Sequence, residues 1–245
     1  MIIAAAGSGE RMGLDRNKVL LPLHGIPILI RSVAAFAVHP WVEECVITVR
    51  AEDYAAVQAL LEQWRVKNCK LAVGGPRRQD SVAAGLAVLA PDLDWVLIHD
   101  AARPLVEPEI IDGAYKAVQE HQAVGVAVPV KDTIKLVDEG QFVADTPPRS
   151  KLWAVQTPQA FNSRLIREAY ARAARENWEV TDDCSLVERL GVKVKLIPGS
   201  YTNIKITTVE DLDVAAAILS KRSEGGLMHN TAVRTGIGYD VHRLV

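Results

Sequence analysis

The sequence predicts an α/β protein in which helices cover both faces of one mostly parallel sheet. Short apolar runs alternate with longer stretches whose apolar residues recur at helical spacing, a pattern typical of consecutive βαβ units. A glycine-rich turn follows the first apolar run directly, and such turns present backbone amides to anions. The chain has 245 residues, 49% of them hydrophobic and 24% charged, enough for one large core. We therefore expect a Rossmann-like three-layer sandwich.

Seven short apolar runs, bounded by turn-forming or polar residues, are predicted to be the strands of this sheet. They are Ile2–Ala5, Cys45–Val49, Lys70–Val73, Trp95–Ile98, Val124–Pro129, Trp153–Gln156 and Val194–Ile197. We also expect Trp153 and Phe161 to lie in the core.

Helices are expected between these strands. Apolar residues recur at helical spacing in residues 29–37 and again in residues 54–64. Pro108 suits the first turn of a helix over Glu107–Glu120. Thr208–Asp211 has the pattern of a capping box, which predicts a final helix that ends at Ser220.

Two regions interrupt the alternation and suggest the domain organisation. Residues 131–150 are polar and turn at Asp138–Gly140, so we expect a hairpin arm that projects from the sheet. Ser223–Gly226 has the composition of a linker. We predict a catalytic domain over residues 1–222 and a disordered tail over residues 223–245.

Composition excludes several classes of function. The formal net charge of −2 gives no reason to expect nucleic acid or an anionic membrane as a partner. The three cysteines are far apart in the sequence and fit neither a disulfide framework nor a zinc ribbon. The apolar start of the chain is too short for a signal peptide or a membrane span. We expect a cytoplasmic protein.

The segment Ala4–Gly13 is the first candidate for a binding site. Gly7 and Gly9 allow backbone amides to approach a phosphate, and Arg11 and Lys18 add two positive charges. A dinucleotide fingerprint fits poorly, because the third glycine comes one residue late, and a Walker loop lacks its Gly-Lys-Ser/Thr end. The plain alternative is a strand–turn–helix elbow with two solvated basic residues.

Five stretches together carry a resemblance to a known family. They are Gly7–Lys18, Gly74–Ser81, His99–Pro104, Thr157–Gln159 and Asn203–Thr207. In this order they resemble the 2-C-methyl-D-erythritol 4-phosphate cytidylyltransferases over residues 1 to about 222. A glycine loop alone would be weak support, whereas five blocks in order are specific.

The resemblance implies a reaction in which a substrate phosphate attacks the α-phosphorus of CTP and pyrophosphate leaves. It implies Mg²⁺ or another divalent cation as cofactor, and a homodimer clasped through the hairpin arm. Cations rather than a strong base suit this chemistry, because the attacking phosphate is already ionised. Two alternatives stay open: a cytidylyltransferase for another polyol phosphate such as ribitol 5-phosphate, and a non-catalytic nucleotide-binding scaffold.

The resemblance also implies roles for individual residues. The catalytic set is Arg11, Lys18 and Lys205. The nucleotide contacts are Ala5, Ala6, Gly7, Gly9, Gly75, Asp80, Ser81, Asp100 and Ala101. The contacts to the polyol phosphate are Arg103, Thr133, Arg149, Thr157 and Thr181, of which Thr133 and Arg149 reach across the dimer interface. Asp100 would also hold the Mg²⁺.

Several of these residues could instead have a purely structural role. Asp100 could cap a helix, and Lys205 could be the outward residue of an edge strand. His99 is expected to be packed rather than to bind metal, and Asp182 with Asp183 is expected to cap a helix that runs through Leu190. Pro76 has no N–H to offer a base, a departure from the family that weakens the CTP assignment.

The tail carries a second resemblance. Gly236–Leu244 resembles the opening strand of the 2-C-methyl-D-erythritol 2,4-cyclodiphosphate synthases, in which an Asp-x-His pair binds zinc. Asp240 and His242 would be two ligands of an incomplete site, because a working zinc site takes three protein ligands. We therefore expect the start of a second enzyme domain that binds no zinc tightly by itself.

Overall fold

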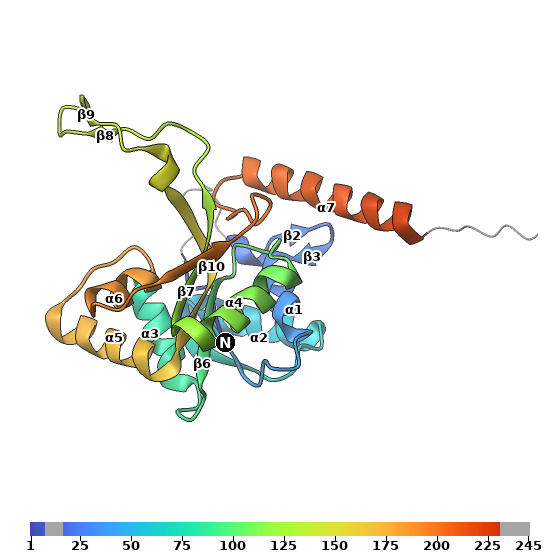
Figure 1. Ribbon diagram of the computed structural model, residues 1–245. Coiled ribbons are helices and arrows are strands. Elements are labelled where there is room, and N and C mark those ends of the chain that lie inside the picture. Colours follow the sequence, from blue (N-terminus) through green and yellow to red (C-terminus); the bar gives the residue numbers. More distant parts are fainter. Residues whose placement is uncertain (8–16, 231–245) are drawn as a thin grey trace, which may run out of the picture.

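The computed structural model in Figure 1 describes residues 1–7 and 17–230, with side chains as far as residue 223. Its main sheet has seven strands in the order β11-β7-β10-β6-β1-β4-β5. Their bounds are β1 Ile2–Ala4, β4 Cys45–Val49, β5 Cys69–Val73, β6 Trp95–Asp100, β7 Ala123–Pro129, β10 Trp153–Asn162 and β11 Lys195–Pro198. Each of the seven predicted strands overlaps one of these.

The sheet is parallel except for β10, which runs antiparallel to both of its neighbours. The prediction ended this strand at Gln156, but β10 continues to Asn162 past an irregularity in register between Gln156 and Gln159. A proline has no N–H for the ladder, so the strand passes Pro158 through this irregularity. Phe161 is buried, as predicted, whereas Trp153 is 40% exposed and the expectation of a core position was wrong.

Helices cover both faces of the sheet, which confirms the predicted three-layer sandwich. On one face lie α1 (Ile28–Ala37), α2 (Tyr54–Gln63) and α4 (Pro108–His121). On the other lie α3 (Arg78–Val88), α5 (Ser163–Glu176) and α6 (Asp183–Arg189). Strand side chains alternate between the two resulting cores, as a buried parallel sheet requires.

Capping follows the sequence signals where these were specific. Pro108 occupies the first turn of α4. The side chain of Asp182 accepts a hydrogen bond from the amide of Ser185 and caps α6. Both predictions are confirmed. The short elements around this frame are η2 Lys18–Leu20, β2 Pro22–Leu23, β3 Ile26–Pro27, η3 Ala51–Asp53 and η4 Arg149–Lys151.

The arm is a hairpin of β8 (Leu136–Val137) and β9 (Val143–Asp145) that reaches away from the sheet (Figure 1). Its turn is closed by Asp138, whose carboxylate accepts hydrogen bonds from the amides of Gly140 and Phe142, both at 2.9 Å. The projecting hairpin is therefore present where the sequence predicted it, and its apolar side chains are exposed.

The last helix, α7, spans Glu210–Asn230. The carboxylate of Asp211 accepts hydrogen bonds from the amides of Thr207 and Thr208 at 2.7 and 2.9 Å, which is the capping interaction that the sequence indicated. The predicted end at Ser220 was wrong, because the helical backbone continues through Ser223–Gly226. Among the described residues, no helix is long and apolar enough to cross a membrane.

Candidate active site

A cavity of about 240 Å³ lies at the carboxyl ends of β1 and β6. Open parallel sheets place their ligands at this edge. Four of the five sequence blocks contribute to it, together with residues next to the first block. The residues around it are Ala4, Ala5, Ala6, Gly7, Lys18, Val19, Pro76, Arg77, Arg78, Ser81, Asp100, Ala102 and Lys205. Lys18 and Lys205, far apart in the sequence, thus border one hollow.

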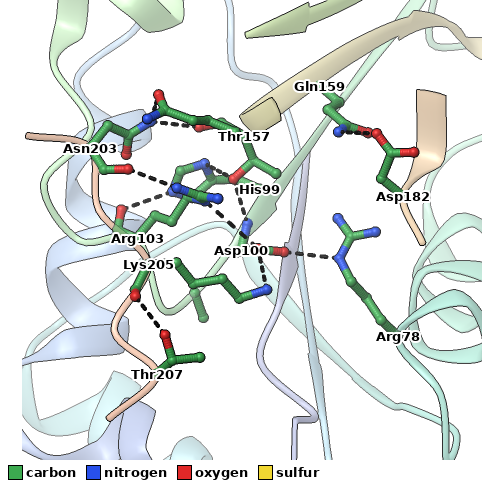
Figure 2. Close-up of polar contacts among 12 residues, drawn as sticks. Arg78, His99, Asp100, Arg103, Thr157, Gln159, Asp182, Asn203, Lys205 and Thr207 are labelled. Carbon is green, nitrogen blue, oxygen red and sulfur yellow. Dashed lines mark hydrogen bonds and ion pairs between the residues drawn. The ribbon is translucent and has the colours of Figure 1, made fainter. Parts of the chain in front are cut away.

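Asp100 is the centre of charge in this cavity (Figure 2). Its Oδ2 lies 2.8 Å from Nζ of Lys205, and its Oδ1 lies 2.9 Å from Nε of Arg78. Burial alone would raise the pKa of Asp100, but the charges of Arg78, Lys205 and Arg103 hold it well below its usual range. The carboxylate is therefore ionised.

This geometry excludes the purely structural roles considered for Asp100 and Lys205. Asp100 is the last residue of β6 and pairs with cations, so it does not cap a helix. Lys205 lies in a segment without strand structure and turns its ammonium group to Asp100. It is therefore not the outward residue of an edge strand.

Lys18 is held at the cavity by the residue before it. The buried side-chain amide of Asn17 donates hydrogen bonds to the carbonyl oxygen of Ala5 at 3.0 Å and to the carboxylate of Asp53 at 2.8 Å. Asn17 also caps the short helix η2, in which Lys18 is the first residue. The lysine is thereby fixed next to the end of β1.

The segment Gly74–Ser81 closes another side of the cavity. A Cβ on Gly74 would lie 2.7 Å from both the Cβ of Ala6 and the Oγ of Ser81, so only glycine allows this close approach. Ser81 borders the cavity, as expected for a nucleotide contact.

Asp80 and Gly75 shape this loop rather than border the cavity. The carboxylate of Asp80 accepts a hydrogen bond from the amide of Arg77 at 3.2 Å and pairs with its guanidinium at 2.7 Å. A Cβ on Gly75 would overlap with the Cβ of Asp80.

Arg78 is a site residue that the sequence analysis missed. Its guanidinium bridges two buried carboxylates, with Nε 2.9 Å from Asp100 and Nη2 2.8 Å from Asp183. Tyr170 completes the group by donating a hydrogen bond to Asp183 at 2.5 Å. Arg78 lies in the segment Gly74–Ser81, but no local pattern in the sequence indicates its two carboxylate partners.

A second layer of polar groups, which does not border the cavity, supports the backbone of Asp100 (Figure 2). Its amide donates a hydrogen bond to the hydroxyl of Thr157 at 3.0 Å, and that hydroxyl lies 3.0 Å from Nδ1 of His99. Nε2 of His99 donates to the carbonyl oxygen of Arg103 at 3.1 Å, so Nδ1 is the acceptor and Thr157 donates to it. Burial lowers the pKa of His99 to about 4, and the ring is neutral and packed, as expected.

This layer explains why Thr157 and Arg103 do not border the cavity, although both were expected to contact the polyol phosphate. The hydroxyl of Thr157 is buried in the chain of hydrogen bonds to Asp100 and His99. The guanidinium of Arg103 donates to the carbonyl oxygen of Asn203 at 2.8 Å, two residues before Lys205. Thr157 thus joins β10 to β6, and Arg103, just after β6, joins the end of that strand to the segment that carries the lysine. Ala101 is also buried, and Ala102 borders the cavity in its place.

The remaining predicted residues lie elsewhere. Thr133 and Arg149 are exposed on the arm, and Arg149 donates a hydrogen bond to the carbonyl oxygen of Lys131 at 2.8 Å. Thr181 is exposed just before the cap of α6. Gly9, Arg11, Asp240 and His242 lie outside the described residues.

No cluster of three or more carboxylate, histidine or cysteine ligands occurs in the part of the chain that the structure describes. Asp100 is the carboxylate at the cavity that could serve a metal. A single carboxylate matches the way Mg²⁺ binds when nucleotide phosphates supply its other ligands.

Comparison with known proteins agrees with the geometry. A 2-C-methyl-D-erythritol 4-phosphate cytidylyltransferase from Caldanaerobacter subterraneus subsp. tengcongensis is 47% identical over 222 residues, which cover 90% of this chain and 98% of the relative. A bifunctional enzyme IspD/IspF from Desulfotalea psychrophila is 42% identical over all 245 residues, and this chain spans 62% of its length.

Solved structures share the fold. A crystal structure of 4-diphosphocytidyl-2C-methyl-D-erythritol synthase from Anaerococcus prevotii superposes with a TM-score of 0.80 at 34% identity, covering 89% of this chain and 94% of the other. The profile of the IspD family, 2-C-methyl-D-erythritol 4-phosphate cytidylyltransferase, matches residues 1–221. The chain therefore belongs to this cytidylyltransferase family, a family of nucleotidyltransferases.

Proposed function

We propose that the chain transfers CMP from CTP to 2-C-methyl-D-erythritol 4-phosphate and releases pyrophosphate. The observation that carries this proposal is the shared cavity of Lys18, Lys205 and Asp100 beside the backbone of Ala5–Gly7. Two polyanions must meet in such a site, and fixed positive charges stabilise the additional charge on the phosphoryl group in the transition state.

The reaction needs little proton transfer. A phosphate oxygen of the acceptor, largely ionised at neutral pH, attacks the α-phosphorus of CTP in line while the bond to pyrophosphate breaks. Lys18 and the amides of Ala5–Gly7 hold the triphosphate, and Arg11 is proposed to join them. Lys205, which is 38% exposed, exchanges its ion pair with Asp100 for a contact to the reacting phosphoryl group.

A divalent cation fits this cavity through Asp100. Its carboxylate is ionised and offers the oxygen ligands that Mg²⁺ prefers. When bound, Mg²⁺ would supply neutralisation of the nucleotide phosphates. Arg78 keeps Asp100 in place on the side away from Lys205, so the carboxylate stays oriented when the lysine moves to the substrate.

The arm is proposed to form a homodimer and to bring Thr133 and Arg149 to the polyol phosphate in the partner's cavity. Leu136, Val137 and Phe142 expose apolar side chains on it, and an isolated two-stranded hairpin is marginally stable in water. Both facts favour a docked arm. Thr181 is proposed as a further acceptor contact, and the exposed Trp153 lies at the base of the arm.

The segment 223–245 is proposed to lead into a second enzyme. The alignment with the bifunctional relative over all 245 residues supports this. We expect Asp240 and His242 to bind no zinc tightly unless the rest of that domain is present. Stoichiometric zinc in the purified chain, lost on cutting after Gly226, would overturn this expectation.

A panel of pyrophosphate-release assays tests the reaction directly. It crosses four nucleoside triphosphates with 2-C-methyl-D-erythritol 4-phosphate and ribitol 5-phosphate, each with and without Mg²⁺. We expect turnover with CTP and the methylerythritol phosphate only. Equal turnover with ribitol 5-phosphate would favour a broader polyol phosphate enzyme. Calorimetric binding of CTP without pyrophosphate from either acceptor would favour a non-catalytic scaffold.

A further inference from the structure

Two of the three cysteines face each other at the end of the sheet opposite the active-site cavity. Cys45 is the first residue of β4 and Cys69 the first residue of β5, and the two are paired directly in the parallel register. Their side chains share the sheet face that packs against one hydrophobic core. Neighbouring strands lie about 4.8 Å apart, which is inside the range of about 4.4–6.8 Å that Cα atoms of disulfides span.

The two thiols differ in access. Cys45 is 5% exposed, whereas Cys69 is half-buried and borders a surface hollow of about 670 Å³. Their mutual interaction lowers the pKa of Cys69 and raises that of Cys45 well above its usual range. A small reagent therefore meets Cys69 first, and Cys69 is also the thiol that ionises more easily.

We propose that Cys45 and Cys69 form a reversible disulfide within one chain when the protein meets a low-molecular-weight disulfide. The thiolate of Cys69 attacks one sulfur of the reagent, forms a mixed disulfide and releases one small thiolate. Cys45 then loses its proton and attacks the Cys69 sulfur, which forms the Cys45–Cys69 bond and releases the second small thiolate. The protein loses two electrons and two protons, and the reagent is reduced to two thiols.

The local backbone favours closure of this bond. Among the residues that the structure describes, β5 is the edge strand and pairs only with β4, so no second described strand opposes a small shift of its first residue. Asn68, immediately before it, has a positive φ of 57° and marks the turn from which the strand starts. The two Cβ atoms can thus come closer together through a small shift of the first residue of β5, without movement of the rest of the sheet.

The closed loop would enclose a part of the chain that supports the nucleotide cavity. Residues 45–69 contain α2 and Asp53, and Asp53 accepts the hydrogen bond from Asn17 that fixes Lys18. Closing a loop of this length restricts the unfolded chain. The oxidised protein is therefore expected to unfold at a temperature several °C higher than the reduced protein.

Cys184 supplies an internal control. It is buried in the core on the other face of the sheet, and burial raises its pKa. Because it faces neither of the other cysteines, it should remain a free thiol while the pair is oxidised.

The test uses the full chain in oxidised glutathione, followed by alkylation and mass spectrometry of intact protein and peptides. We expect wild type and Cys184→Ser to lose two alkylation sites and to yield a linked 45–69 peptide, which dithiothreitol reverses. Cys45→Ser should instead trap glutathione on Cys69, and Cys69→Ser should remain unmodified at Cys45. Circular dichroism confirms that each variant is folded. Retention of three alkylatable thiols in the wild type, or disulfides only between chains or only through Cys184, would overturn the proposal. The result does not depend on the nucleotide chemistry.

Discussion

The ammonium nitrogen of Lys205 lies 2.8 Å from Oδ2 of Asp100. A carboxylate at the end of β6 thereby holds the lysine at the cavity. From this position the ammonium group can exchange the carboxylate for a phosphoryl group of the substrate. The contacts of Arg103 with Asn203 and of Asn203 with Thr157, at 2.8 and 2.9 Å, fix the backbone on which the lysine stands. Positioning of this kind reduces the reorganisation that the reaction requires.

Removal of either cavity lysine should slow turnover while the fold survives. For Lys18→Ala and for Lys205→Ala we expect kcat to fall roughly 10²–10³-fold, about 3–4 kcal/mol of transition-state stabilisation. The measurement is pyrophosphate release at saturating CTP, with circular dichroism as a check on folding. Lys116→Ala, an exposed lysine on α4, is the matched control and should retain the wild-type rate. Near-normal kcat in both cavity variants would refute the assigned roles.

Arg78 should contribute to the free energy of unfolding as well as to the position of Asp100 in the cavity. Arg78→Gln leaves Asp183, which is 1% exposed, as a buried carboxylate without its cation. Removing one partner of a buried pair destabilises by about 3–5 kcal/mol, measured by urea unfolding. The double variant Arg78→Gln/Asp183→Asn should recover much of this loss, because the amide still accepts the hydrogen bond from Tyr170.

A control for the Arg78 experiment is the exposed pair of Arg172 with Glu176, 2.7 Å apart. Arg172→Gln should leave the free energy of unfolding close to that of the wild type, because exposed ion pairs contribute little. If the double variant were no more stable than Arg78→Gln alone, the unpaired charge of Asp183 would not be the cause of the loss.

Some features of the fold depend on local signals in the sequence, and others depend on contacts between distant residues. Strands such as Cys45–Val49 were predicted to the residue because apolar, β-branched runs specify them within a few positions. The partners of Arg78 could not be predicted, because Asp100 and Asp183 reach it only through the packing of the sheet and α6.

The misplaced residues have a related cause. Thr157 belongs to a block shared with the family, but only the fold decides that its hydroxyl turns inward to His99. Trp153 is apolar and stands in a strand, yet it lies where β10 leaves the core for the arm and is exposed. Apolar character alone therefore did not fix its burial.

Gly74 should tolerate no side chain. In Gly74→Ala the new Cβ would lie 2.7 Å from the Cβ of Ala6, which must displace either the end of β1 or the Gly74–Ser81 loop. We expect a loss of about 1–3 kcal/mol in unfolding free energy together with a higher KM for CTP.

Gly113→Ala is the contrasting variant for Gly74. Gly113 lies in α4, and its added Cβ would meet only Ile197 at an ordinary 3.7 Å. We expect this variant to gain about 0.4–1 kcal/mol with unchanged KM. If Gly74→Ala behaved like Gly113→Ala, the close packing at Ala6 would not constrain the site.

The proposed exchange of arms can be tested by mixing two inactive variants. Lys205→Ala disables the cavity of its own subunit, and Arg149→Ala should disable the cavity of the partner. In a mixed dimer one site then has both residues intact, so random mixing should restore about a quarter of wild-type activity. The assay is pyrophosphate release after the two proteins are dissociated and reassembled together. No recovery, with dimers verified by sedimentation, would place Arg149 in its own subunit's site, and full activity of Arg149→Ala alone would place it outside any site.

The neutral, buried ring of His99 should make stability depend on pH. Its pKa is lowered to about 4 by burial, whereas in the unfolded chain it is about 6.5. As the pH falls below about 6.5, the unfolded state takes up a proton that the folded state does not take up until about pH 4. The stabilisation is therefore complete above pH 6.5 and is lost progressively between these values, by about 3 kcal/mol in total.

His99→Gln should remove this dependence, because an amide in the same place can donate to the carbonyl oxygen of Arg103 and accept from Thr157 but does not titrate. Urea unfolding of both proteins between pH 7 and pH 4.5 measures the difference in their free energies of unfolding. Carboxylates such as Asp100 and Asp53 contribute equally to both proteins and cancel in that difference. Over this pH range, which stops short of the folded pKa, the wild type should lose about 2.4 kcal/mol relative to the variant. Parallel curves would mean that His99 takes up its proton equally easily in the folded and unfolded chains, and the chain of hydrogen bonds from Asp100 through Thr157 to a neutral His99 would then be wrong.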